Sequence, residues 1–396
     1  MVSKKKELNF INLILFLASP FLALPSILIG IYQSKSKFSL NLFALFMGLT
    51  AYMYIPTDTN DKTAYYFTYQ SFQNYSWSQF LDYFIIDPNI LFNFLLYGSS
   101  NLGISFQVLS FLSMYFIVRT VLYIFNNIVR EASLNQKIYF ISFILIILSF
   151  SFKRLFSGFK FHLGVSFLLL SLYEGLFNNN SKKGLLFLFL AVLGHYSLMV
   201  FAPVYFMIKY LPKKTTIYRY IFLASFIFLF LSISGILDIA EGLGLPDNYI
   251  DRSSKYTDKE DDFVKQGLIK GGFSTLIGFL SSVVWSYVAY LYLIFRTKQK
   301  SVLRNIVYLS FAITNLFYSL PFVFSRYLDF LAIIFALLVI YETGKTLKIN
   351  YVFILLFSIH LGTDLIIMRY NLYASYIDFE VSTLISILLR EYPSYL

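Results

Sequence analysis

Two apolar stretches between residues 157 and 211 carry basic and imidazole side chains at the end that lies far from the polar loop joining them. Lys160 and His162 open the first stretch, Arg154 precedes it, and His195 lies inside the second. At about 1.5 Å per helical residue, His162 lies roughly 24 Å and His195 roughly 18 Å from the loop. Ionisable groups at that depth in a bilayer are costly, so we interpret them as candidates for function.

The cations suit a diphosphate ligand, whose oxygens Lys and Arg bind through charge-assisted hydrogen bonds. If residues 153–164 form one helix, Lys153 and Lys160 lie on one stripe, and Arg154 and His162 lie on the next. The alternative for Lys153 and Arg154 is snorkelling, in which they only reach lipid phosphate. We expect Arg154, Lys160 and His162 to bind substrate.

Arg326 and His195 each allow a structural and a functional interpretation. Arg326 begins a later apolar span and is either a further anion clamp or one half of a local ion pair with Asp329. His195 lies in the apolar stretch Ala191–Ser197 and is either a structural histidine at a helix break or a group that transfers protons or contacts phosphate. We expect both residues to belong to the site.

An early polar segment adds carboxylates beside tyrosines: Asp58, Asp61, Tyr65 and Tyr66. Carboxylates accept hydrogen bonds from sugar hydroxyls and can act as general bases, while aromatic faces cover sugar C–H surfaces. A calcium loop is disfavoured because the sixth-position glycine and the closing glutamate are missing. With three histidines and no cysteine, we expect no metal and no cofactor.

Composition indicates an all-α polytopic membrane protein. The chain is 58% hydrophobic and only 13% charged, which is too few charged residues to cover a soluble fold of 396 residues. We expect a single integral membrane domain over residues 1–396, with roughly 10–12 transmembrane helices, a re-entrant segment and external loops at 56–104 and 238–270. The net charge of +11 lies largely in short loops and reflects orientation rather than nucleic-acid binding.

The positive-inside rule sets the expected topology. Lys182, Lys213 and Lys298 should face the cytoplasm, while Asp61 and Asp258 should face outward. The basic loops at Lys182 and Lys213 can share one side only if the chain between them enters and returns, so we expect a break near Gly194–His195, aided by Pro203. The N-terminal basic residues require a similar bend, at Pro20 and Pro25.

The segments Ser157–Ser166 and Leu190–Ser197, joined by a short basic loop, resemble the paired motifs of bacterial polysaccharide polymerases of the Wzy class and of EpsG-like proteins. In that resemblance Lys160 takes the place of the family's arginine and Gly194 that of the phenylalanine before its histidine. Asp58–Tyr66 is similar to the family's Asp-x-x-x-Tyr region, and Ser325-Arg326 to its late Ser/Thr-Arg.

The resemblance implies an O-antigen repeat-unit polymerase in the bacterial inner membrane, with its active site on the periplasmic side. It would join polyprenyl-diphosphate-linked oligosaccharides, its partners being that substrate, the lipid bilayer and, as a candidate, a chain-length regulator protein. An O-antigen ligase and a lipid-linked oligosaccharide flippase or transporter are the alternatives. As catalytic residues we expect His195, Asp58 and Asp61, with His195 preferred as the base because an exposed aspartate has a low pKa.

Overall fold

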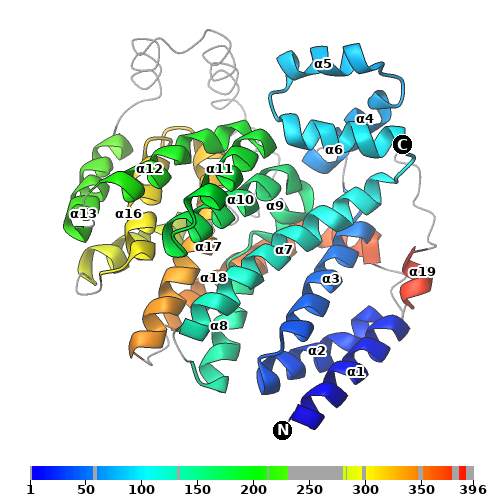
Figure 1. The fold of residues 1–396 in the computed structure, drawn as a ribbon, viewed down its shortest axis with the longest axis horizontal. Coiled ribbons are helices and arrows are strands. Elements are labelled where there is room, and N and C mark those ends of the chain that lie inside the picture. The colour runs from blue at the N-terminus through cyan, green and yellow to red at the C-terminus, as the bar shows by residue number, and fades with distance from the viewer. Residues whose placement is uncertain are drawn as a thin grey trace.

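The computed structural model describes residues 2–56, 60–131, 134–211, 214–230, 280–281, 283–296, 300–346, 351–376 and 383–388. Every regular element in these ranges is a helix, which confirms the all-α class (Figure 1). The predicted loop 238–270, with Asp258, lies outside the described residues, and so do Lys213 and Lys298.

The N-terminal part is a helical hairpin followed by a span. It comprises α1 (Val2–Ala18), α2 (Pro20–Ser34) and α3 (Lys37–Met53). The chain bends at Ser19, whose hydroxyl accepts from the Leu22 N–H at 3.5 Å, with Pro20 as the first residue of α2. The expected bend at Pro20 is therefore present, whereas Pro25 lies inside a continuous helix.

Three helices occupy the segment predicted as the first external loop. They are α4 (Asp61–Phe72), α5 (Trp77–Ile86) and α6 (Ile90–Asn101). In Figure 1 this group, labelled α4 to α6, lies together at one end of the molecule beyond the end of α3. Ser76 and Gln79 form a capping box that begins α5, which accounts for a helix that the sequence analysis did not anticipate.

The central part carries the two motif segments. It comprises α7 (Phe106–Glu131), α8 (Gln136–Leu148), α9 (Phe152–Ser157), α10 (Phe159–Leu172), a π-helical turn η1 (Tyr173–Phe177), α11 (Ser181–Gly194), a 3₁₀ turn η2 (Tyr196–Phe201) and α12 (Ala202–Tyr210). Helix α10 packs on both α7 and α11.

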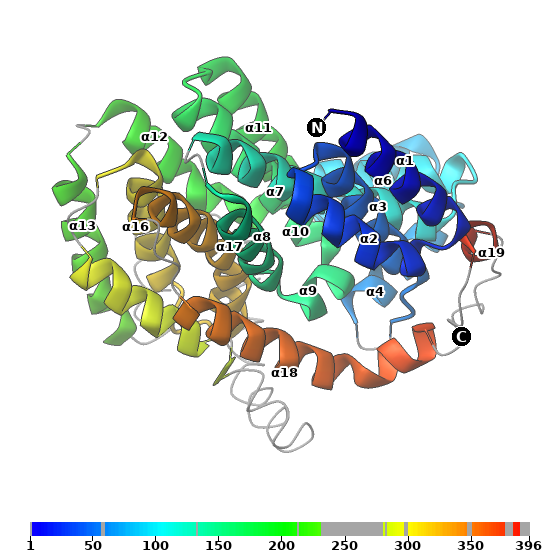
Figure 2. The ribbon, with the colours of Figure 1, turned by 90° about the horizontal axis from the view of Figure 1, so that it is seen from below.

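The C-terminal part closes the bundle. It comprises α13 (Thr215–Ala224), η3 (Ser225–Phe230), the helix Val283–Phe295, α16 (Val302–Asn315), α17 (Pro321–Thr346), α18 (Tyr351–Tyr376) and α19 (Leu384–Leu388). Helix α18 crosses beneath α8 and α9 (Figure 2).

Three helices are long and apolar enough to cross a membrane alone within the described ranges: Phe106–Glu131, Val323–Gly344 and Tyr351–Ser375. Five shorter apolar helices accompany them, including Lys37–Met53 and Gln136–Leu148. The chain is thus an all-α polytopic membrane protein. Val323–Gly344 is the most enclosed of the three, because 89% of its apolar 18-residue stretch is buried.

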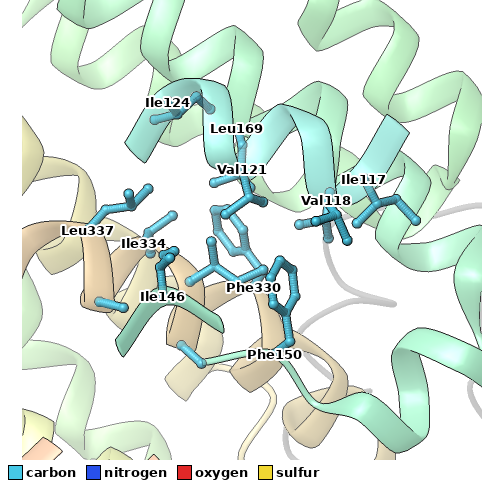
Figure 3. Close-up of a cluster of buried hydrophobic side chains, with 14 of the residues drawn as sticks. Ile117, Val118, Val121, Ile124, Ile146, Phe150, Leu169, Phe330, Ile334 and Leu337 are labelled. Carbon is cyan, nitrogen blue, oxygen red and sulfur yellow. The ribbon is translucent and has the colours of Figure 1, made fainter. Parts of the chain in front are cut away.

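The core lies where α7, α8, α10 and α17 meet (Figure 3). Val121 from α7, Ile146 from α8, Leu169 from α10 and Phe330 from α17 are all buried there. This cluster fixes α17 against α10, so the polar residues at the ends of these helices have a defined separation.

Candidate functional site

A helix break at Gly158 positions the first motif. Gly158 ends α9 and precedes α10, so residues 153–164 do not form one helix and the two continuous stripes expected there are wrong. A Cβ at Gly158 would lie 3.1 Å from the Arg154 carbonyl oxygen and 3.4 Å from Asp61 Oδ2. Glycine therefore relieves a tight contact with the Arg154 carbonyl, while Asp61 lies at ordinary contact distance.

Asp329, inside α17, brings Arg154 and His162 together. Arg154 Nη1 donates to Asp329 Oδ1 at 3.0 Å and also to the carbonyl of Ser325. His162 Nε2 lies 3.9 Å from Asp329 Oδ2, and these two buried atoms have no hydrogen-bond partner in the described part of the chain. The local Arg326–Asp329 pair considered above is therefore wrong, because Asp329 pairs with Arg154 instead.

Lys160 pairs with Asp87, a carboxylate that the sequence analysis did not single out. Its Nζ lies 3.4 Å from Asp87 Oδ2 and 5.2 Å from the centre of the Tyr65 ring. Asp87 caps the end of α5, and its Oδ1 accepts from the backbone N–H of Asn89 at 3.1 Å and from the Asn89 side-chain amide. Burial raises the pKa of Asp87, but Lys160 and the asparagine hydrogen bonds outweigh it, and the pKa lies below its ordinary value.

Asn89 links this carboxylate to the second motif. Its Oδ1 accepts from the backbone N–H of Tyr196 at 3.1 Å, directly after His195. Asn89 is 3% exposed, so it satisfies a buried donor at the start of η2. The connection between α5 and α6 thus contacts Lys160 and the segment of His195 at once.

His195 lies at the predicted helix break. Its backbone is extended between α11 and η2, and Pro203 stands in the first turn of α12. His195 Nδ1 and Ser197 Oγ lie 2.8 Å apart, and the ring meets Phe161 edge-on at 5.2 Å. Tyr327, one residue after Arg326, donates its hydroxyl to the Ser197 carbonyl at 3.0 Å, which ties this break to α17.

Glycines set the distance between the two motifs. A Cβ at Gly164 would lie 2.7 Å from Leu198 Cδ1 and 3.0 Å from His195 Cβ. A Cβ at Gly194 would lie 3.3 Å from the Gly164 Cα. The backbones of α10 and α11 are therefore in direct contact, as in membrane helix pairs built on small residues, and Lys160 and His195 are held on one scaffold.

Asp61, the first residue of α4, pairs with Arg326. Asp61 Oδ2 lies 3.6 Å from Arg326 Nη2, and the two side chains are 49% and 39% exposed. The structure thus brings together two residues that the sequence analysis placed in the site separately. Asp58 lies outside the described residues.

Lys62 fixes the segment that presents Asp61. It is fully buried, and its Nζ donates to the carbonyls of Ala51 and Tyr54 at 2.8 Å each. These carbonyls end α3 and would otherwise lack partners. Burial lowers the pKa of Lys62, which lies outside the candidate membrane-spanning helices, to about 7.

The two tyrosines expected to cover sugar differ in placement. Tyr65 lies beside Lys160 and meets Phe92 and Phe159 edge-on. Tyr66 turns away, stacks on Tyr69 and contacts Phe106. Only Tyr65 lies at the cation cluster.

Asp364 supports the site from α18. It accepts from the Ser151 hydroxyl at 3.0 Å and from the Lys153 backbone N–H at 3.1 Å, and so caps the beginning of α9. His360 Nδ1 instead lies 3.3 Å from the Ser281 hydroxyl. Asp364 thus has a structural role, because its hydrogen-bond partners are Ser151 and Lys153 at the beginning of α9.

Sequence reasoning missed Asp87, Asn89 and the role of Asp329. Asp87-Pro88-Asn89 is a polar turn between two aromatic-rich apolar segments, and Asp329 is a carboxylate inside an apolar span; both signals were readable. No cluster of three or more potential metal ligands occurs in the described ranges.

The fold and this cluster define an all-α membrane protein whose cations, carboxylates and histidines gather at the ends of α9, α10 and α17. The family model described as "EpsG family" matches residues 37–380, most of the chain. The protein therefore belongs to the EpsG family. Neither the comparison with curated proteins nor that with solved structures found a match.

Proposed function

We propose that the protein polymerises lipid-linked oligosaccharide repeat units, as O-antigen polymerases do, at the periplasmic face of the bacterial inner membrane. The observation that carries the proposal is the convergence of Arg154, Lys160 and Arg326, from distant parts of a membrane protein of the EpsG family, beside His162 and His195. Such a cluster suits a diphosphate leaving group, and stabilising the charge on that group is the largest catalytic contribution to expect.

In the proposed reaction a hydroxyl of the acceptor glycan attacks the anomeric carbon of the donor sugar. The new glycosidic C–O bond forms as the bond between that carbon and the diphosphate oxygen breaks. The electron pair leaves with the polyprenyl diphosphate, which the cations bind, and the hydroxyl proton passes to a base of the protein.

His195 is our first choice as the base, and Asp61 is the second. The contact between His195 Nδ1 and Ser197 fixes the orientation of the imidazole ring. The roles can be separated with His195→Gln, which keeps hydrogen bonding but removes titration, and Asp61→Asn. Normal polymerisation by His195→Gln between pH 6 and 8, with loss of activity in Asp61→Asn, would transfer the role of base to Asp61.

The proposal is tested by glycan length in a strain whose chromosomal copy is deleted and replaced by plasmid variants. Single-repeat glycans in the deletion strain support polymerase activity, an uncapped acceptor indicates a ligase, and cytoplasmic accumulation of the lipid-linked unit indicates a flippase.

Lys160→Ala should strongly reduce the amount of polymer at unchanged protein level, while Lys160→Arg should retain much of it because the positive charge remains. Normal chain length in Lys160→Ala would remove Lys160 from the site.

A further inference from the structure

Among the described residues, each of three cations of the site already has a carboxylate partner without any ligand. Arg154 pairs with Asp329, Lys160 with Asp87 and Arg326 with Asp61. A diphosphate adds at least two negative charges, and excess like charge in a partly buried site is costly. Binding therefore requires that carboxylates withdraw from cations.

The ion pairs differ in how easily they can be exchanged. Arg154 and Asp329 are in hydrogen-bond contact at 3.0 Å, and the Asp329 side chain is 5% exposed inside α17. Lys160–Asp87 and Arg326–Asp61 are longer, at 3.4 and 3.6 Å, and all four of their side chains reach solvent. Although the Arg154 side chain is 30% exposed, its carboxylate partner is enclosed and its guanidinium also donates to the Ser325 carbonyl. The first pair is therefore the hardest to exchange, and the two longer pairs are held more loosely.

The two loosely held carboxylates also share an origin. Asp61 begins α4 and Asp87 ends α5, so both belong to the helical group at one end of the molecule, while Lys160 and Arg326 belong to the bundle (Figure 1). Lys62 holds the start of α4 against the end of α3, so the two carboxylates leave the cations by rotation of their own side chains while the cations stay in place. Asn89, whose backbone N–H and side-chain amide both donate to Asp87 Oδ1, would lose these two contacts in the same movement.

We propose that Asp87 and Asp61 occupy the places of the two phosphate groups when no substrate is bound, and that the lipid diphosphate displaces them from Lys160 and Arg326. The inference rests on the proposed function and locates the diphosphate within that site, between the two exchangeable cations and apart from the Arg154–Asp329 pair.

The test compares Asp87→Asn with wild type in equilibrium binding of polyprenyl diphosphate to the full-length protein in nanodiscs, with polyprenol as the probe lacking the diphosphate. The asparagine keeps the size and the carbonyl acceptor for Asn89 but gives Lys160 no anionic partner. Because a partly exposed ion pair is worth up to about 1 kcal/mol, the variant should bind the diphosphate about two- to fivefold more tightly and the polyprenol unchanged.

Asp82→Asn is the matched control. Asp82 is exposed on α5 and makes no hydrogen bond or ion pair with the described residues, so this variant removes the same charge from the same helix without touching Lys160. Its affinity for the diphosphate should equal that of wild type. An equal gain in both variants would mean that only the general charge of the helical group matters, and this would overturn the inference.

A second measurement needs no substitution. Hydrogen exchange of a peptide covering residues 87–93 should become faster when wild type binds polyprenyl diphosphate, because the Asn89 N–H loses its acceptor. Slower or unchanged exchange, or unchanged affinity in Asp87→Asn, overturns the inference. The proposed function would still stand after such an outcome, provided that wild type binds the diphosphate and Lys160→Ala does not. If neither wild type nor Asp87→Asn binds the diphosphate, both proposals are wrong.

Discussion

At the scale of single residues, the carboxylates of the site differ in how far they are buried. Asp329 is enclosed by α17 and its partners, while Asp61 is half exposed at the beginning of α4. Removing one partner of a buried pair leaves an uncompensated charge, whereas an exposed pair contributes little. The same substitution should therefore have different consequences at these two positions.

Asp329→Asn should lower the free energy of unfolding by about 3 kcal/mol, because Arg154 loses its charged partner inside the bundle. Asp61→Asn should lower it by no more than about 1 kcal/mol. Thermal unfolding of both variants in the same nanodiscs checks the contrast. Equal, small losses would contradict the enclosed character of the Arg154–Asp329 pair.

Lys62 predicts a pH dependence of stability. Its folded pKa of about 7 lies below the ordinary 10.5, so between these values the unfolded chain binds more protons. The free energy of unfolding should therefore rise as pH increases from 7 towards 10, and the cost of burying the charge is fully present below pH 7. Unfolding at pH 7 and at pH 9.5 should show a gain in wild type that is smaller in Lys62→Met. The same gain in both proteins would exclude Lys62 as its source.

At the scale of elements, the hairpin of α10 and α11 sets the geometry of the site. Its glycines place two backbones in contact where side chains would separate them. A helix pair of this kind is stiff, since there is little side-chain packing to rearrange.

Gly164→Val should destabilise the protein by about 1–3 kcal/mol and reduce polymer formation, because its side chain would force His195 and Leu198 away. Gly362→Ala is the control, since a Cβ there meets nothing within 4 Å, and it should leave stability equal or raise it by about 0.5–1 kcal/mol. Unfolding and polymer length are measured together. Wild-type behaviour of Gly164→Val would show that the backbones can separate without consequence.

Local rules predicted part of this arrangement and failed where distant segments meet. Gly194 and Pro203 indicated the break at His195, which the structure confirms. The spacing of Arg326 and Asp329 allowed a local pair as one of two interpretations, but the partner of Asp329 comes from 175 residues away. Asp87 and Lys160 are 73 residues apart. Such pairings depend on how the helices pack, so the periodicity of residues within one helix cannot predict them.

At the scale of the whole molecule, the group α4 to α6 meets the open end of the α10–α11 hairpin, where Lys160 and His195 lie, and we expect this end to be periplasmic. The distribution of basic loops predicts this sidedness.

The chain has no cysteine, so single introduced cysteines report sidedness directly. Cysteines replacing Lys182, Lys213 and Lys298 should resist a membrane-impermeant thiol reagent in intact cells, while those replacing Asp61 and Asp258 should react. Labelling of all five after permeabilisation is the control. Reaction at position 213 in intact cells would contradict the topology.

The Arg154–Asp329 contact also has a consequence for biogenesis. The two residues are separated by 175 positions, and ribosomes add about 5–20 residues per second, so Arg154 enters the membrane roughly 10–35 seconds before Asp329 exists. During that interval α9 and α10 hold an arginine and a histidine that have not yet met their carboxylate. Insertion of α17 therefore completes the charge pairing of helices made much earlier, and a nascent chain that stops before α17 keeps this arginine without its carboxylate.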